Sequence, residues 1–226
     1  MSALTLFIGN KNYSSWSLRP WLLLREAGIH FDEVRFELYN ADTKAQIAEC
    51  SPSGKVPVLR DDGAVNGPLT VWDSLAICEY LADKFPHLNL WPQAADARAV
   101  ARAVSAEMHS GFSALRLHMS MNCRERFPNE GRTPEVLNDI ARINAIWTDC
   151  RARFGAGGKF LFGPFSIADA MYAPVVVRFQ TYAVELEGSN QAYAQAILSL
   201  SSLQEWVQAG SAEITRLVQF EPYTKL

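Results

Sequence analysis

The chain has 226 residues, enough for one large domain or two small ones, and its hydrophobic content of 49% is ordinary for a protein with a sizeable core. A formal net charge of −3 and the absence of any block of lysines and arginines argue against nucleic acid or an anionic membrane surface as partner. No window approaches the roughly 18 apolar residues of a membrane-spanning helix, and the first residues carry no basic targeting region, so we expect a cytoplasmic protein that acts on a small molecule.

The first part of the chain alternates short strand-like and helix-like segments. Residues 4–8 predict a strand, and the segment EVRFEL at 33–38 alternates apolar with charged residues, as a second strand does. Residues 17–27 between them predict a helix, with Ser17 as its N-cap and Gly28 as its left-handed terminator.

The same alternation continues toward residue 85. Residues 42–50 predict a second helix, residues 56–59 a third strand and residues 69–71 a fourth strand. Asp73 and Ser74 then begin a third helix whose apolar residues form one stripe. The predicted order is βαβαββα.

Only the helical period appears after a proline-flanked segment at residues 86–93. We expect five helices, near residues 94–121, 134–154, 167–183, 191–198 and 200–217. The predicted fold class is α/β plus all-α: an N-terminal domain at 1–85, a linker at 86–93 and a helical-bundle domain at 94–226.

One of these helices carries a distinctive start. Ser166 and Asp169 have the spacing of a capping box, although aspartate replaces the usual glutamate or glutamine. Pro174 lies within the same apolar run and predicts a kink. We assign these residues a structural role.

The cysteines and histidines are too far apart in sequence to predict a disulfide framework or a metal site. They are Cys50, Cys78, Cys123, Cys150, His30, His87, His109 and His118. We expect reduced thiols within helical apolar patterns and no metal.

Four features together resemble one protein family. They are the βαβαββα order before a helical half, SGKVPVL at 53–59, WDS at 72–74 and SIADA at 166–170. In this order and at these separations they resemble the cytosolic glutathione transferases over nearly the whole chain. The opening SSWSLR is most similar to the zeta class of serine-type members, where the stretch is SSCSWR, with Trp16 here in place of the cysteine. The resemblance implies a thioredoxin-like N-terminal domain, glutathione as co-substrate and a homodimer.

The γ-glutamyl end of glutathione carries both an ammonium and a carboxylate. The resemblance assigns the ammonium to Asp73 and the carboxylate to the Ser74 hydroxyl and the free N–H groups beside it, which a helix start presents to anions. Aspartate and serine are also ordinary N-cap residues, so the residues alone leave a purely structural cap open.

The cysteinyl backbone of glutathione needs a strand edge to pair with, and its glycyl carboxylate needs a cation. A cis Val56–Pro57 bond would turn the Val56 backbone outward to pair with the cysteinyl backbone, although most X-Pro bonds are trans. Lys44 and Lys55 are candidates for the glycyl carboxylate, against the alternative that they are simply solvated.

The thiol must ionise, because a free thiol with a pKa near 8.5 is mostly protonated at pH 7. A hydroxyl donating to a charged group contributes about 1.5–3 kcal/mol, which equals one to two pKa units. By family position we choose Ser14 as the donor, with Ser15 next and Tyr13 as a third possibility. A nucleophilic serine is not indicated, because no G-x-S-x-G elbow is present, and a redox role lacks a cysteine at the start of the first helix.

The electrophile site is expected between the two domains. Its predicted walls are Met108, Phe112, Leu115, Arg116, Met119 and Arg178. The resulting hypothesis is a glutathione transferase that conjugates the thiolate to a small apolar electrophile. Two alternatives stay open: a non-catalytic ligand-binding or interaction protein of the same fold, and a glutathione-dependent isomerase, dehalogenase or peroxidase.

Overall fold

The computed structural model describes residues 3–224 and contains a four-stranded sheet in the order β2-β1-β3-β4. The strands are β1 (Leu4–Ile8), β2 (Asp32–Arg35), β3 (Val58–Asp61) and β4 (Leu69–Trp72). β1 pairs parallel with β2 and antiparallel with β3, and β3 pairs antiparallel with β4. Apolar residues of β1 and β3 are buried, so the centre of the sheet forms the core of this half.

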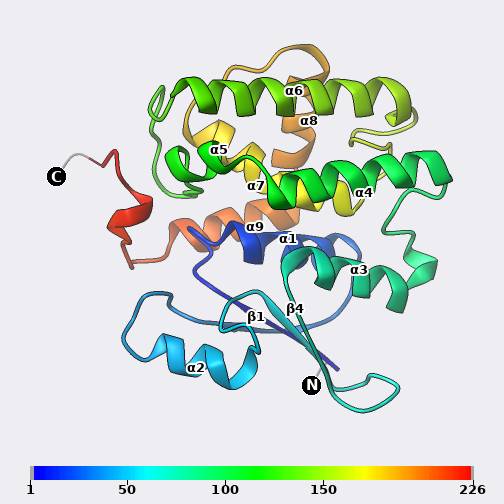
Figure 1. Cartoon of the computed structure of the whole chain (residues 1–226), viewed down its shortest axis with the longest axis vertical. Helices are drawn as coiled ribbons and strands as arrows, with labels where there is room; N and C mark the ends of the chain where they lie inside the picture. The colour runs from blue at the N-terminus through cyan, green and yellow to red at the C-terminus, as the bar shows by residue number, and fades with distance from the viewer. Residues whose placement is uncertain (1–2, 225–226) are drawn as a thin grey trace.

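The helices confirm the predicted βαβαββα order and the helical second half. They are α1 (Ser15–Glu26), α2 (Thr43–Cys50), α3 (Ser74–Lys84), the 3₁₀ turn η1 (Pro86–Leu88), α4 (Ala95–Ser110), α5 (Ser113–His118), α6 (Pro134–Phe154), α7 (Ile167–Thr181), α8 (Gly188–Leu198), α9 (Ser201–Ser211) and η2 (Val218–Phe220). α1 and α3 lie between the sheet and the helical half, whereas α2 lies on the far side of the strands (Figure 1). The fold is therefore a thioredoxin-like unit followed by a helical bundle.

The first helix begins earlier than the sequence predicts. Ser14, and not Ser17, is the N-cap, and its Oγ accepts a hydrogen bond from the Ser17 N–H at 3.3 Å. The Ser17 Oγ instead accepts from the Gly9 N–H at 3.1 Å, which joins the helix to the end of β1. Gly28 has the predicted left-handed conformation, with a φ of 66°.

The predicted second strand is present but shorter than predicted. β2 ends at Arg35, and all four of its residues are exposed, because it is an edge strand that pairs only with β1. Of the apolar residues in this segment, Phe36 stacks on Phe7 at a centroid distance of 6.1 Å, and the Leu38 side chain packs over Gly9.

The predicted helix at 94–121 is two helices. Gly111 ends α4, and Phe112 has a left-handed φ of 59°, so the chain turns before α5. A Cβ at position 111 would lie 2.8 Å from the Glu107 carbonyl oxygen, which explains the glycine. The apolar pattern continues through the turn and conceals it.

The last predicted helix ends six residues early, at Ser211. Beyond it, the Glu213 carboxylate accepts hydrogen bonds from the N–H groups of Lys11 and Asn12 at 2.7 and 3.2 Å. The chain after α9 is thereby tied to the loop that precedes α1, a contact that spans almost the whole sequence.

Helix α7 is the centre of the helical half and packs against α1 and α4. Its predicted capping box is confirmed: the buried Asp169 carboxylate accepts from the Ser166 N–H at 2.9 Å and from the Ser166 hydroxyl at 3.0 Å. It also accepts from the Leu161 N–H at 3.1 Å, so one carboxylate joins the helix start to the preceding loop. Pro174 lies within the continuous helix, and the kink stays a prediction.

Gly210 allows α9 to lie directly on the loop before α1. A Cβ there would approach the Lys11 carbonyl carbon and the Asn12 nitrogen to 2.9 Å, and both are backbone atoms. Although alanine favours an α-helix by about 1 kcal/mol over glycine, we expect Gly210→Ala to lower the free energy of unfolding by about 1–3 kcal/mol through this overlap. Urea unfolding measures it, with the exposed Gln208→Ala as control. Unchanged or higher stability of Gly210→Ala would contradict the close packing.

All four cysteines are free thiols. Burial raises the pKa of Cys123 and Cys150 to about 12, and it raises the pKa values of Cys50 and Cys78 as well. Within residues 3–224 no group of three or more histidine, cysteine or acidic side chains is placed to hold a metal ion. None of the helices in that range is long and apolar enough to cross a membrane.

Candidate functional site

A cavity of about 780 Å³ opens beside the start of α1, a size that suits a small-molecule ligand. Its walls come from the thioredoxin-like half and the helical half. The lining residues are Tyr13, Ser14, Ser15, Trp16, Leu38, Tyr39, Asn40, Ala41, Thr43, Lys44, Ile47, Gly54, Lys55, Val56, Arg116, Ser120, Met121, Arg178 and Phe220.

Ser14 and Ser15 both line this cavity, but their hydroxyls have different partners. The Ser14 Oγ donates to the Ser17 Oγ at 2.8 Å and also accepts the Ser17 N–H. The Ser15 Oγ accepts from the Arg178 Nη2 at 3.1 Å, and within the described chain no acceptor takes the Ser15 proton. Ser14 therefore secures the start of the helix, while Ser15 keeps a donor available to a ligand.

Tyr13 lies next to the serines, but its hydroxyl is already engaged. It donates to the Glu221 carboxylate at 2.6 Å and accepts from the Arg124 guanidinium at 2.9 Å and the Leu217 N–H at 3.2 Å. Burial and the bond to Glu221 raise the pKa of Tyr13. This hydroxyl stabilises the C-terminal segment and is poorly placed to donate to a ligand.

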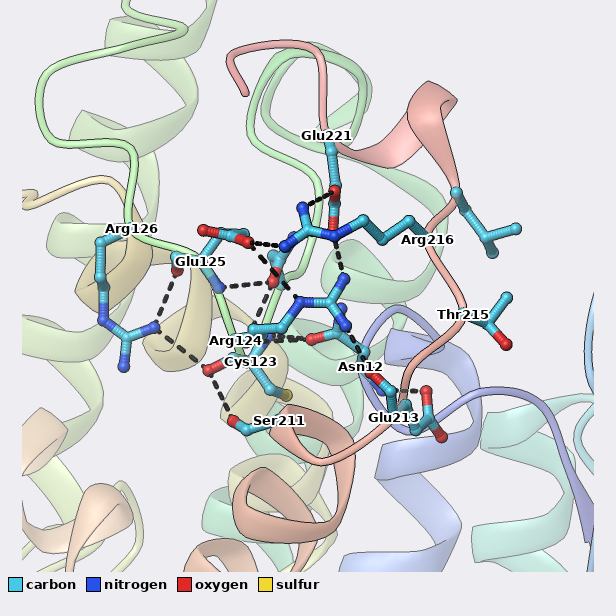
Figure 2. Close-up of polar contacts among 12 residues, drawn as sticks. Asn12, Cys123, Arg124, Glu125, Arg126, Ser211, Glu213, Thr215, Arg216 and Glu221 are labelled. Atoms are coloured by element: carbon cyan, nitrogen blue, oxygen red, sulfur yellow. Dashed lines mark hydrogen bonds and ion pairs between the residues drawn. The ribbon is translucent and has the colours of Figure 1, made fainter. Parts of the chain in front are cut away.

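Glu221 is the centre of that contact. Its buried carboxylate also pairs with Arg216 at 3.0 Å, and Arg216 in turn reaches Glu125 at 2.8 Å, so two arginines join the C-terminal segment to the 122–125 loop (Figure 2). The adjacent Phe220 stacks on Tyr13 at 5.6 Å and forms part of the cavity wall. Sequence patterns did not predict this contact, because Tyr13, the 122–125 loop and the C-terminal segment are far apart in sequence: Glu221 lies 97 positions from Arg124 and 208 from Tyr13.

Three of the residues predicted to bind the peptide line the same cavity. Lys44 comes from α2, and Lys55 and Val56 come from the loop before β3. The Val56–Pro57 bond is cis, as the hypothesis required, and Pro57 itself lies outside the lining.

Asp73 and Ser74 also lie outside the cavity lining. Asp73 is the N-cap of α3: its Oδ1 accepts from the Leu75 and Ala76 N–H groups, and its Oδ2 lies 3.1 Å from the His109 Nε2. His109 packs edge-on against the Trp16 ring in the cavity wall, with 5.3 Å between ring centroids. Asp73 is therefore connected to the cavity wall through the His109 side chain. The Ser74 hydroxyl is buried and has no hydrogen-bond partner among the described residues.

The predicted walls are only partly right. Arg116 and Arg178 line the cavity, whereas Met108, Phe112, Leu115 and Met119 are buried in the core. The break before α5 explains the difference, because the stripe predicted for one straight helix turns inward at Phe112. Ser120, Met121 and Phe220 line the cavity instead; the first two follow the end of α5, and Phe220 belongs to η2.

Cations gather around Trp16. The guanidiniums of Arg19 and Arg116 lie 4.4 and 4.6 Å from the Trp16 ring centroid. Burial, and then repulsion from Arg116, lower the pKa of Arg178 to about 9. This part of the cavity wall is aromatic and positive; Arg116 and Arg178 were predicted to line it, whereas the stacking of Arg116 on Trp16 was not.

Comparison with known proteins identifies the family. The model of the glutathione S-transferase N-terminal domain matches residues 13–84, and that of the C-terminal domain matches residues 130–209. Maleylacetoacetate isomerase of Rattus norvegicus is 30% identical over 178 residues, 76% of each chain. Glutathione S-transferase GstB of Escherichia coli K12 is 29% identical over 174 residues, which cover 74% of this chain and 79% of the relative. Glutathione S-transferase Z2 of Arabidopsis thaliana is 24% identical over 72% of this chain and 75% of its own.

Solved structures agree on the fold. A glutathione transferase homologue from Burkholderia GL BGR1, solved with bound glutathione, has a TM-score of 0.69 at 21% identity and covers 93% of this chain and 99% of its own. Ure2p in complex with glutathione has a TM-score of 0.68 at 16% identity, covering 91% and 98%. The matched domain models and the relatives together show that the chain belongs to the glutathione S-transferase family, near its zeta class.

Proposed function

We propose that the protein binds glutathione in the cavity at the start of α1, ionises its thiol and transfers the thiolate to a small electrophile with an apolar body. The observation that carries this proposal is the Ser15 hydroxyl, which lines the cavity at the positive end of α1 and donates to no acceptor among residues 3–224. A solved structure of the same fold contains bound glutathione, which supports glutathione as the ligand.

The tripeptide would extend from the serines toward the thioredoxin-like half. Val56 offers its backbone beside the cis bond, and Lys44 and Lys55 provide cations for the glycyl carboxylate. For the γ-glutamyl end we propose Asp73 and Ser74. Asp73 has a φ of 77°, a conformation that costs a non-glycine residue about 1–3 kcal/mol and that concentrates at ligand sites.

The chemistry then follows from charge and position. A hydroxyl donating to the sulfur anion lowers the thiol pKa, and the proton passes to solvent. The thiolate forms a bond to the electrophilic carbon while the bond to the leaving group breaks and its electron pair departs with that group. Holding both reactants in one cavity supplies the proximity that raises the rate.

The test compares two adjacent serines. In Ser15→Ala, we expect the pKa of bound glutathione, followed by thiolate absorbance, to rise by about one to two units and turnover to fall about tenfold or more. In Ser14→Ala, we expect the thiol pKa to stay within about half a unit and the stability to fall by about 1 kcal/mol, as for a lost helix cap. Tyr13→Phe is the control and should leave the thiol pKa unchanged.

Each other outcome has a definite meaning. If Ser14→Ala alone raises the thiol pKa, the donor is Ser14. If glutathione bound to the unaltered protein titrates like free glutathione, the transferase proposal is wrong and a non-catalytic binding protein of this fold is favoured.

A glutathione-dependent isomerase is the second candidate, because a relative from Rattus norvegicus is named maleylacetoacetate isomerase and one from Caenorhabditis elegans is named probable maleylacetoacetate isomerase. The same thiolate would add to the substrate and leave again. Product analysis separates the two functions: a transferase yields a stable glutathione conjugate, whereas an isomerase releases glutathione unchanged.

A further inference from the structure

A second cavity, of about 430 Å³, lies on the helical half, where α6 and α8 pack against each other (Figure 1). We call it the α6–α8 cavity, and its lining residues are Arg151, Gly158, Lys159, Ala192, Gln195, Ala196 and Ser199. None of them lines the cavity at the start of α1. The wall of the α6–α8 cavity contains two cations and no carboxylate, so its charge favours an anion.

Arg151 is held in place by the loop that follows α6. Its Nη1 donates to the carbonyl oxygens of Gly158 at 3.1 Å and Phe160 at 2.8 Å, and its Nε is buried without a hydrogen-bond partner among the described residues. Arg151 forms no ion pair within residues 3–224. Carbonyl groups fix the guanidinium but do not cancel its charge, and charges withdrawn from water are normally paired or bind a ligand. This guanidinium is therefore fixed in position while its charge is uncompensated.

Lys159 brings a second cation to the same wall. Its ammonium forms no ion pair within the described part of the chain. The loop that carries it is closed by two hydrogen bonds between the backbones of Phe160 and Gly163, at 3.2 and 3.3 Å, and by the bonds from Arg151. Most exposed lysines are simply solvated, but this one lies in a cavity wall beside a second, fixed cation.

The alternative role of Arg151 is to stabilise the C-terminal end of α6, where basic side chains are favourable. That helix end carries about half a negative charge, whereas Arg151 and Lys159 carry two full positive charges, so the wall stays positive. Arg153 belongs to the same last turn, but it pairs with Asp149 at 2.9 Å and lies outside the cavity lining. Helix stabilisation therefore explains one basic residue here, but not two cations in one cavity wall without an acid.

The α8 side of the cavity is neutral and can form hydrogen bonds. Gln195 contributes an amide, and the Ser199 hydroxyl donates to the Ala196 carbonyl oxygen at 2.8 Å and keeps its lone pairs for an incoming donor. Ala192 and Ala196 contribute only methyl side chains. This surface suits the hydroxyl groups of a small polar molecule better than an extended apolar group.

We propose that the α6–α8 cavity binds a small phosphate monoester. Arg151 and Lys159 contact its phosphate, and Gln195 and Ser199 contact hydroxyl groups of its organic part. The cavity is larger than a free phosphate ion needs, so the organic part fits beside the charge. The proposal is independent of the function proposed above, since the two cavities share no lining residue.

The charges of this wall favour a phosphate over a carboxylate. A phosphate monoester carries a charge of about −1.5 to −2 at pH 7, which two cations balance, whereas a carboxylate carries only one charge. Lysine binds phosphate as a point charge. Arg151 already uses Nη1 for two carbonyl groups, which leaves less of its planar fork for the paired contact that a carboxylate makes.

Calorimetry with a charged probe and its neutral counterpart tests the site. We expect glucose 6-phosphate to bind at least about tenfold more tightly than either glucose or inorganic phosphate. Arg151→Gln and Lys159→Gln should each weaken the binding of glucose 6-phosphate by about tenfold, as expected for the loss of one charged contact. Arg153→Gln is the matched control and should change this affinity less than about twofold, because Arg153 pairs with Asp149 outside the cavity.

Three results would overturn the proposal. Equal affinity for glucose 6-phosphate and glucose would show that the wall does not select an anion. Equal affinity for inorganic phosphate and the ester would show that the cavity takes a free phosphate and that α8 contributes nothing. A loss of ester affinity in Lys55→Gln, with Lys159→Gln unaffected, would place the ester in the cavity at the start of α1. Because Lys159 is exposed, Lys159→Gln keeps the test decisive even if Arg151→Gln does not fold.

Discussion

Replacement of Asp169 by alanine is expected to lower the free energy of unfolding by about 3–4 kcal/mol near pH 5, because buried donors that lose their acceptor cost about 1–3 kcal/mol each. The donors are the Leu161 N–H and the N–H and hydroxyl of Ser166. Asp169 is fully buried at the start of the central helix α7, so water cannot replace it. Urea unfolding of the variant measures the loss.

Asp169 also makes the stability of the protein depend on pH, and its raised pKa determines the direction of that dependence. Burial raises the pKa of Asp169 from 3.8 to about 6, against hydrogen bonds from Leu161 and Ser166 that lower it. The folded state therefore holds this proton at a pH where the unfolded state has released it, so the contribution of Asp169 to stability decreases as the pH rises from about 4 to about 6. Integrated to pH 7, the decrease is about 2 kcal/mol.

Asp169→Asn is the matched variant, since it keeps the shape and cannot ionise. The difference in stability between the unaltered protein and Asp169→Asn should shrink by about 2 kcal/mol from pH 4 to pH 7. A difference that is constant with pH would show that the carboxyl titrates in its ordinary range and that burial does not control it.

Replacement of Glu221 by alanine is expected to release the segment that follows α9. Removing one partner of a buried ion pair costs about 3–5 kcal/mol, and the Glu221 side chain, 4% exposed, pairs with Arg124 at 2.6 Å and with Arg216 at 3.0 Å. Because these contacts hold one terminal segment, the loss should appear as local opening. Hydrogen exchange in residues 213–223 should accelerate at least about 100-fold, with little change in the core helices.

Glu125 offers a close control, because its carboxylate contacts the same two arginines from a side that is 28% exposed. Exposed ion pairs contribute about 1 kcal/mol or less, so Glu125→Ala should accelerate exchange less than about tenfold. Equal effects of the two variants would show that the burial of Glu221 is unimportant.

The pH dependence of this contact has the opposite sign to that of Asp169. Burial acts to raise the pKa of Glu221, but hydrogen bonds from Tyr13 and Arg124 outweigh it, and the net pKa is lowered. The contact is therefore fully formed above the ordinary glutamate pKa and weakens as the pH falls through the lowered value. Since Phe220 belongs to the cavity wall, acid should also open that wall.

Local signals predicted several elements of the fold because the residues that begin or end them lie close to them in sequence. Asp73 caps α3, Ser166 and Asp169 form the box of α7, and Gly28 ends the region of α1 with a positive φ. The same reasoning failed at Gly111 and Phe112, where the apolar pattern continues through a change of direction.

The most direct prediction of the site came from a short motif. Ser14 and Ser15 are adjacent in sequence, and the structure places both in the cavity wall. By contrast, Arg116 and Arg178 form no ion pair with a carboxylate among the described residues. Whether an arginine has an acidic neighbour depends on the tertiary structure, and sequence periodicity does not report it. The engagement of Tyr13 by Glu221 likewise joins positions 208 residues apart.

In the proposed function the sulfur that is activated belongs to glutathione, while three of the protein's own cysteines are buried. Cys78, Cys123 and Cys150 are buried with raised pKa values, and a tryptophan occupies the position at the helix start where a zeta-type sequence has cysteine. Alkylating reagents attack thiolates and spare thiols. Under the proposed transferase function, an electrophile in the cavity should therefore react with bound glutathione in preference to these three cysteines.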